Sequence, residues 1–200
     1  RPRGSPDDDQ RGRQVPSVSR FREEIGEQPE VAGRVLDAAA PAVEAIAARL
    51  RASSPTGFVI AARGSSDHAA LYAKYLFGRR NRALVSLAAP SLFTHYGTGP
   101  DLAGACVIGI SQSGASPDVI AVIEEAHRQG CPTIAITNDG GSPLAKAADR
   151  VIGLEAGPER GGRASTTYPA DLHVLCLIPQ APRPRPRCAA GLRAVRRDDA

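Results

Sequence analysis

The chain has 200 residues, of which 42% are hydrophobic, and its formal net charge at pH 7 is +4. A chain of this length buries about 70% of the surface that its extended form exposes, which is enough for one packed domain. No apolar run reaches the roughly 20 residues of a membrane-spanning helix, and no basic segment followed by an apolar one opens the sequence. We therefore expect a cytoplasmic protein without a membrane partner.

The positive charge lies at the two ends of the chain. Residues 1–20 carry a net charge of +2 and residues 179–200 carry +4, so residues 21–178 carry −2. A nucleic-acid-binding domain presents a basic face on its folded part. The charge distribution therefore predicts no nucleic-acid partner.

Both ends also lack the hydrophobic periodicity of packed elements. Residues 1–20 are rich in turn formers and are predicted to be disordered. Residues 179–200 repeat Arg, Pro and Ala without a pattern, as GC-rich DNA does in a wrong reading frame, and the sequence has no Met even at position 1. We interpret residues 179–200 as a disordered or out-of-frame tail, and expect a truncated or frameshifted chain with one domain over residues 21–178.

The four cysteines are scattered, without the CxxC spacing of a metal or redox site. They are Cys106, Cys131, Cys176 and Cys188. Three of them stand in apolar runs, which favours buried free thiols in a reducing compartment. No cluster of His, Cys or carboxylate residues has ligand spacing, so neither a metal nor another cofactor is predicted.

Helices and short strands alternate between the two ends. In chain order, we predict helices or strands as follows: a helix over 21–28 that Pro29 ends, a helix over 31–51, a strand over 57–62, a helix over 65–78, a strand over 83–88, a short helix over 90–96, a strand over 105–110, a helix over 117–129, a strand over 132–137, a short helix over 142–148, a strand over 150–154 and a helix over 165–178. In the helix over 65–78, Leu71, Tyr72 and Tyr75 are predicted to face inward, and Gly78 to end it.

The predicted strands are short and apolar on both faces. This pattern is typical of a parallel sheet that helices cover on each side. The sequence therefore predicts an α/β fold, a three-layer sandwich in which helices flank a five-stranded parallel sheet in the doubly wound, flavodoxin-like manner.

The loop after the third strand, "SQSGAS" over 111–116, is the candidate binding site. Ligands of doubly wound sheets bind beyond the carboxyl ends of the strands, and a helix start offers free N–H groups to an anion. Ser111, Gln112, Ser113 and Ser116 would surround a phosphate monoester, and Gly114 would let it approach the backbone. The alternative interpretation is a polar turn in which Ser116 simply caps the next helix.

A similar junction follows the first strand, where "RGSSDH" over 63–68 leads into a helix. Either Ser66 or Asp67 could cap that helix. Ser66 could also supply a further hydroxyl to the same rim of the sheet, and Arg63 could supply a charge. The two junctions together favour an anion-binding rim.

Four segments carry a resemblance to a known family: "FREEIGEQPEV", "ARGSSDHAALYAKYL", "SQSGASPDVIAVIEEAHRQGCPTIAITN" and "SPLAKAADRVIGLEAGPE". Together they resemble a sugar isomerase (SIS) domain over about residues 21–178. The "EEIGEQP" segment is similar to the first SIS domain of the isomerase half of glutamine–fructose-6-phosphate aminotransferases and of glucosamine-6-phosphate deaminase-like proteins.

The resemblance implies roles for particular residues. Five of them would hold the phosphate of a sugar phosphate: Ser66, Ser111, Gln112, Ser113 and Ser116. Glu159 matches a glutamate of the family and is the candidate catalytic residue, while Ser165 matches a sugar-binding loop serine. The family's lysine after "AST" is absent, because Thr166 is followed by Thr167.

The resemblance also implies a partner and a function. Family enzymes carry two SIS domains in tandem, so we expect either a homodimer or a missing second SIS domain. The favoured function is a truncated amino-sugar-phosphate isomerase or deaminase. The alternatives are a non-catalytic module that senses a phosphosugar and a non-functional product.

Overall fold

The computed structural model describes residues 18–157 and 164–178. Its sheet has five parallel strands in the order β2-β1-β3-β4-β5. The strands are β1 (Gly57–Ala62), β2 (Leu84–Leu87), β3 (Ala105–Ile110), β4 (Thr133–Thr137) and β5 (Arg150–Gly153). The predicted α/β fold with a five-stranded parallel sheet is therefore confirmed.

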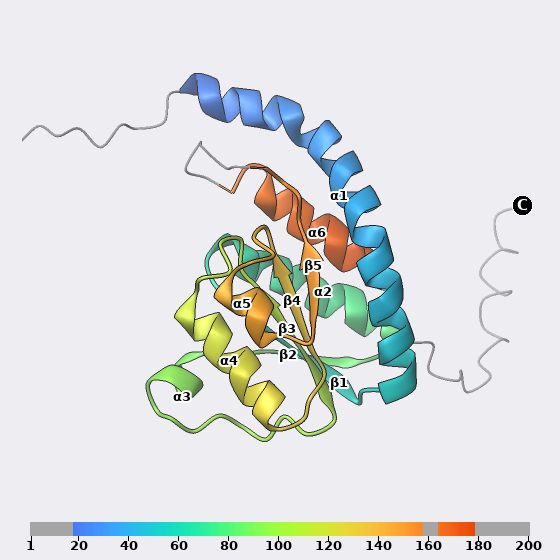
Figure 1. The fold of residues 1–200 in the computed structure, drawn as a ribbon, viewed down its shortest axis with the longest axis vertical. Helices are drawn as coiled ribbons and strands as arrows, with labels where there is room; N and C mark the ends of the chain where they lie inside the picture. The colour runs from blue at the N-terminus through green and yellow to red at the C-terminus, as the bar shows by residue number, and fades with distance from the viewer. Residues whose placement is uncertain (1–17, 158–163, 179–200) are drawn as a thin grey trace, which may run out of the picture.

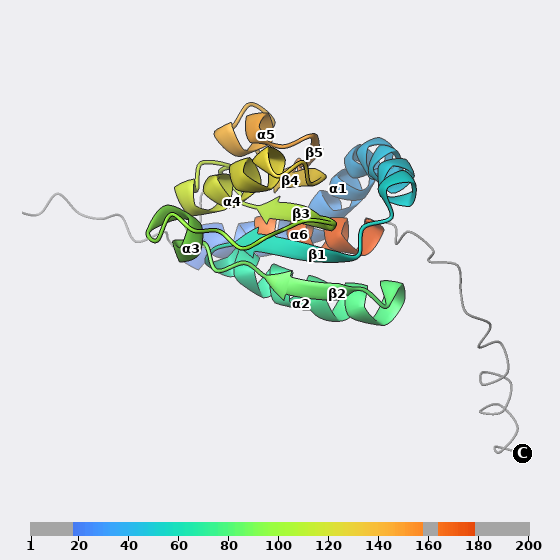
Figure 2. The ribbon, with the colours of Figure 1, turned by 90° about the horizontal axis from the view of Figure 1, so that it is seen from below.

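Helices cover both faces of this sheet (Figures 1 and 2). They are α1 (Val18–Ser53), α2 (Ser65–Asn81), α3 (Ser91–Thr94), α4 (Pro117–Arg128), α5 (Pro143–Ala147) and α6 (Thr167–Leu177). One buried cluster joins α1, α2 and α6 to the sheet, and a second joins α4 and α5 to the opposite face. In Figure 2 the sheet accordingly lies between α4 and α5 on one side and α2 on the other.

The central strand β3 is buried along nearly its whole length, as its apolar sequence predicts. Gly109 of β3 lets α4 lie close to the sheet. A Cβ atom at Gly109 would come within 2.9 Å of Ile123 and 3.1 Å of Val119 and Leu144. The close packing of α4 over Gly109 fixes the helix on the sheet, and it thereby also fixes the loop that joins β3 to α4.

Helix α1 runs through Pro29 and Pro41 instead of breaking at Pro29, so the predicted end at residue 28 is wrong. A proline inside a helix removes one backbone hydrogen bond, and neighbouring contacts must compensate for that loss. Here Gln28 Nε2 donates a hydrogen bond to the Ser165 carbonyl at 2.6 Å, and Val31 and Val35 are buried immediately after the proline. Contacts on both sides of Pro29 therefore hold the helix together, and Figure 1 shows α1 as one curved helix.

Helix α2 buries a different face from the predicted one. Leu71, Tyr72 and Tyr75 are exposed, whereas the buried face consists of small residues with one aromatic ring: Ala69, Ala70, Ala73 and Phe77. The small side chains let α2 pack closely between the sheet and α6. The helix also continues past Gly78 to Asn81, and Arg82 adopts the left-handed conformation that ends it.

The predicted tails fall mostly outside the described residues. Residues 1–17 and 179–200 are not described, and α1 begins at Val18. Within the described part of the chain, none of the helices is long and apolar enough to cross a membrane.

Candidate functional site

Backbone hydrogen bonds hold the loop after β3 against the end of β4. The Ser111 N–H donates to the Ile136 carbonyl at 3.0 Å, which extends the sheet ladder by one residue beyond β3. The Gln112 carbonyl accepts from the Asn138 N–H at 3.0 Å and from the Thr137 hydroxyl at 3.3 Å. Ser111 and Gln112 therefore lie at fixed positions on the carboxyl rim of the sheet, where ligands of such sheets bind.

Gly114 closes this loop in a left-handed conformation with a φ of 61°. A Cβ atom there would lie 2.0 Å from Ser142 Oγ and 2.8 Å from Thr137 Oγ1. The Gly114 carbonyl also accepts a hydrogen bond from the Leu144 N–H at the start of α5. The glycine is thus required for packing against α5, a reason that the sequence did not predict, and its role in letting an anion approach the backbone stays a prediction.

The serine side chains of the loop differ in their surroundings. Ser111 is buried, Ser116 is half-buried, and neither hydroxyl makes a hydrogen bond within the described residues. Ser113 is exposed, and its Oγ accepts from the Ala115 N–H at 3.3 Å. Ser116 occupies the N-cap position of α4 without a capping bond from its side chain, so its hydroxyl is available to a ligand.

Gln112, which lies in the same loop, is half-buried. The helix that follows begins with Pro117, as predicted, and the Ser116 carbonyl accepts its first backbone bond, from the Ile120 N–H. The first N–H groups of a helix have no partner within the helix itself. Available hydroxyls and a helix start therefore meet in one loop.

The junction after β1 lies beside this loop. Ala62 and Ile110, the last residues of β1 and β3, are partners in neighbouring strands. Gly64, with a φ of 62°, occupies the N-cap position of α2, so the predicted cap by Ser66 or Asp67 is wrong. The buried Ser66 hydroxyl instead donates to Asp171 Oδ2 in α6 at 3.1 Å. Tertiary structure thus brings Ser66 a partner that local capping chemistry could not predict.

An ion pair bridges the two junctions. Arg63, directly after β1, contacts Asp118 in the first turn of α4 at 2.8 Å. Asp118 also accepts a hydrogen bond from the Thr94 hydroxyl at 3.2 Å. Because the guanidinium offsets the carboxylate, Asp118 repels an anion at the start of α4 less than a free carboxylate would.

Asn138 is a rim residue that the sequence reasoning missed. Its Nδ2 donates to the Gly157 carbonyl at 2.8 Å, and its Oδ1 accepts from the Ala156 N–H at 2.9 Å. These two bonds position the chain directly before residue 158. The sequence did contain a signal for Asn138, namely a polar residue directly after the strand β4. Because every strand of a parallel sheet has its carboxyl end at the same rim, such a residue is expected to lie there.

The loop before α6 packs its serine against α1. Ser165 is buried, its hydroxyl donates to Glu24 Oε2, and its carbonyl accepts from Gln28. The predicted sugar-binding hydroxyl of Ser165 therefore has a partner within the protein. The predicted catalytic residue Glu159 lies outside the described residues.

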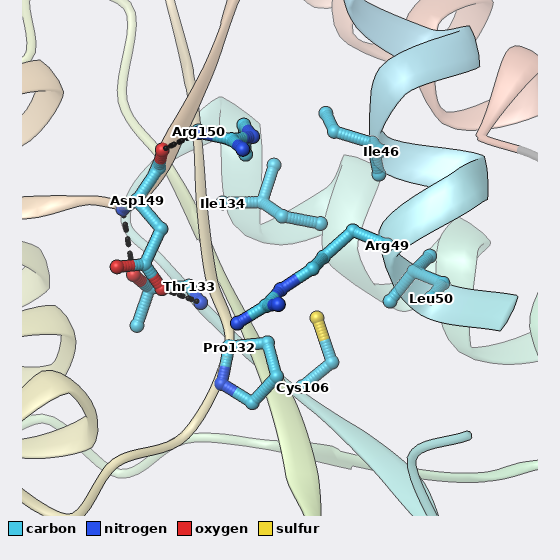
Figure 3. A pocket seen from close by; sticks show the side chains of 9 residues that line it. All are labelled: Ile46, Arg49, Leu50, Cys106, Pro132, Thr133, Ile134, Asp149 and Arg150. Atoms are coloured by element: carbon cyan, nitrogen blue, oxygen red, sulfur yellow. Dashed lines mark hydrogen bonds between the residues drawn. The ribbon is translucent and has the colours of Figure 1, made fainter. Parts of the chain in front are cut away.

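A cavity of about 260 Å³ lies at the opposite end of the sheet, near the amino-terminal ends of β3, β4 and β5 (Figure 3). Its lining consists of Ile46, Arg49, Leu50, Cys106, Pro132, Thr133, Ile134, Asp149 and Arg150. Burial, with smaller effects from Asp149 and Cys131, raises the pKa of Cys106 to about 12. The thiol therefore stays protonated at neutral pH, and a nucleophilic role for Cys106 is disfavoured.

The carboxylate that borders this cavity already has partners. Asp149 Oδ2 accepts from the Thr133 N–H at 2.9 Å, as Figure 3 shows, and Asp149 Oδ1 lies 3.3 Å from His127 Nδ1. Among the described residues, no group of three or more His, Cys, Asp or Glu side chains could hold a metal ion. The acidic and thiol groups of this cavity are thus less suited to a ligand than the hydroxyls of the rim.

Known proteins share this sequence and this fold. The chain is 34% identical over 119 residues to a glutamine–fructose-6-phosphate aminotransferase [isomerizing] from Halobacterium salinarum, and 34% identical over 165 residues to one from Bradyrhizobium diazoefficiens. These matches cover 60% and 78% of this chain. They cover only 20% and 26% of the two relatives, so the chain spans about a quarter of their length or less.

Among solved structures, a protein described as a phosphosugar isomerase from Silicibacter pomeroyi matches with a TM-score of 0.74 and 37% sequence identity. That match covers 80% of this chain and 50% of the Silicibacter chain. A family model described as SIS domain matches residues 55–177, which include β1, the rim loops and α6. The chain therefore belongs to the SIS domain family.

Proposed function

We propose that this chain binds a hexose or hexosamine 6-phosphate at the carboxyl rim of its sheet, and that it forms part of an aldose–ketose isomerase or deaminase of such sugars. The observation that carries the proposal is the loop over 111–116. There, the hydroxyls of Ser111 and Ser116, which make no hydrogen bond to any described residue, meet a helix start on the rim. The names of the relatives, aminotransferase and phosphosugar isomerase, support a phosphorylated sugar as the ligand.

The loop suits a phosphate monoester in its chemistry. Hydroxyl and backbone N–H groups donate to phosphate oxygens, and the partial positive charge of a helix start favours an anion. We assign the phosphate to Ser111, Gln112, Ser113 and Ser116, with Ser66 from the neighbouring junction.

Isomerisation requires more than a phosphate anchor. A base must move a proton between C1 and C2 of the sugar, and an acid or base must open the ring. Glu159 is our candidate catalytic residue, and it lies outside the described residues. The remaining groups would come from a second SIS domain or from a second copy of the chain, which we propose as the partner.

Calorimetric titration with fructose 6-phosphate and glucosamine 6-phosphate tests the anchor. We expect binding of both, and none of unphosphorylated fructose at the same concentration. Ser116→Ala should weaken binding by about 1–2 kcal/mol, or roughly 5- to 30-fold, because a charge-assisted hydrogen bond to the phosphate is lost. The exposed Ser91→Ala at the start of α3 is the matched control and should leave affinity unchanged.

Two outcomes would contradict the proposal. One is the absence of binding for both sugar phosphates at millimolar concentration. The other is equal affinity for phosphorylated and unphosphorylated fructose, which would place the contacts on the sugar and not on the phosphate. Release of ammonia from glucosamine 6-phosphate would separate a deaminase from a module that only binds.

A further inference from the structure

Asp171 of α6 is a buried carboxylate directly behind the rim. Only 1% of its surface is exposed, and its Oδ2 accepts the hydrogen bond from Ser66 Oγ at 3.1 Å. Ser66 is the second residue of α2, next to the loop after β3, because the ends of β1 and β3 are neighbours in the sheet. The residue that we assign to the phosphate thus already donates its proton to a carboxylate.

A serine hydroxyl carries one proton and can donate one hydrogen bond. If Ser66 donates to a phosphate oxygen, it must release Asp171 Oδ2, and a buried carboxylate that loses a donor is destabilised. If Ser66 keeps its bond to Asp171, its hydroxyl presents only lone pairs to the phosphate. The outer phosphate oxygens are acceptors too, so the two groups cannot form a hydrogen bond with each other. The two acceptors therefore compete for one proton.

We propose that Asp171 is a positioning residue of the phosphate site, which holds the Ser66 proton and thereby lowers the affinity for phosphorylated sugars. This inference rests on the proposed function and names the group that sets the strength of the anchor. Asp171 acts on the ligand through Ser66.

An amide at position 171 removes the competition. In Asp171→Asn, the NH₂ group of the new side chain would donate to Ser66 Oγ, so the hydroxyl proton could turn to the phosphate. This substitution should therefore lower the Kd for fructose 6-phosphate by about tenfold, as one charge-assisted hydrogen bond is gained. Asp171→Ala, which removes the acceptor altogether, should change the Kd in the same direction.

The test is calorimetric titration of the full chain with fructose 6-phosphate, combined with a double-mutant cycle. In a Ser66→Ala background, Asp171→Asn should leave the Kd unchanged within about twofold, because no hydroxyl remains to be released. Asp67→Asn is the matched charge control. It removes an exposed carboxylate one residue from Ser66, and should change the Kd less than about twofold in low-salt and high-salt buffer.

The outcomes separate this inference from the proposed function. If wild type and both Asp171 variants bind no sugar phosphate, the proposed function is overturned, and this inference with it. If wild type binds but Asp171→Asn and Asp171→Ala, both folded by their thermal transitions, do not bind more tightly, the inference alone is overturned. An equal gain with and without the Ser66 hydroxyl would also overturn it, since charge alone would then explain the effect.

Discussion

Gly114 combines a left-handed backbone with a position that leaves no room for a side chain. Gly114→Ala should lower the free energy of unfolding by about 2–4 kcal/mol, because the alanine is strained at a φ of 61° and its Cβ clashes with Ser142. Urea denaturation measures the loss. Two other glycines separate the causes: Gly97 has a φ of 63° with open space around a Cβ, and Gly140 has open space without a left-handed φ.

The two control substitutions have defined outcomes. Gly97→Ala should cost about 1–2 kcal/mol from backbone strain alone, and Gly140→Ala should stay within about 0.5 kcal/mol of wild type. If Gly114→Ala costs no more than Gly97→Ala, the packing of the loop against α5 does not constrain this position.

The sequence predicts that several serines lie near the carboxyl rim of the sheet, but it does not predict the hydrogen-bond partner of each serine hydroxyl. The hydroxyls of Ser111, directly after β3, and Ser116, at the N-cap of α4, make no hydrogen bond to any described residue, and their contact with a ligand stays a prediction. The partners of Ser66 and Ser165 are Asp171 and Glu24, which lie 105 and 141 residues away along the chain. No local pattern encodes such contacts, because they depend on how α1 and α6 pack.

Among the elements, the amino-terminal part of α1 depends on its polar contacts with the loop before α6. Glu24→Ala should lower the free energy of unfolding by about 1–3 kcal/mol, because the buried Ser165 hydroxyl loses its acceptor. Glu23→Ala is the matched control. The two residues are adjacent on the same helix and lose the same charge, but Glu23 is exposed.

Chemical denaturation and hydrogen exchange test this prediction together. Glu23→Ala should change stability by less than about 0.5 kcal/mol. In the Glu24→Ala variant, amides of residues 164–170 should exchange faster, while those of β3 should not. Equal effects of the two substitutions would show that α1 is held by its apolar stripe alone.

Helix α1 has one feature that its local sequence predicts and one that it does not. Amphipathic spacing correctly predicted the stripe that buries Val35, Val43 and Leu50, since helical periodicity is a local property. The rule that proline ends a helix failed at Pro29, because contacts with Ser165 and the buried valines outweigh one lost backbone bond. The predicted inward face of α2 is wrong for a related reason. The prediction placed large apolar residues in the core, whereas the close packing of α2 against the sheet and α6 buries alanines.

For the molecule as a whole, large apolar side chains remain exposed on the edge strand β2 and on the helix α2 that packs against it. Leu84 on the edge strand β2 is 84% exposed and Tyr75 on α2 is 74% exposed, and these two elements pack against each other. An exposed edge strand with apolar side chains tends to pair with another chain. We therefore predict that a second copy of the chain covers this edge in solution.

Sedimentation velocity at about 50 µM, well above a micromolar dissociation constant, measures the mass of the assembly. We expect a dimer for the wild type and a monomer for Leu84→Glu combined with Tyr75→Glu, because a charge buried without a partner in the interface opposes association. Leu92→Glu on α3, which is exposed on a different element, is the control and should remain dimeric. A monomeric wild type, or a dimer that persists in the double variant, would contradict an interface at β2 and α2. The variant that separates into monomers should still bind fructose 6-phosphate, because the phosphate contacts that we assign all come from one copy.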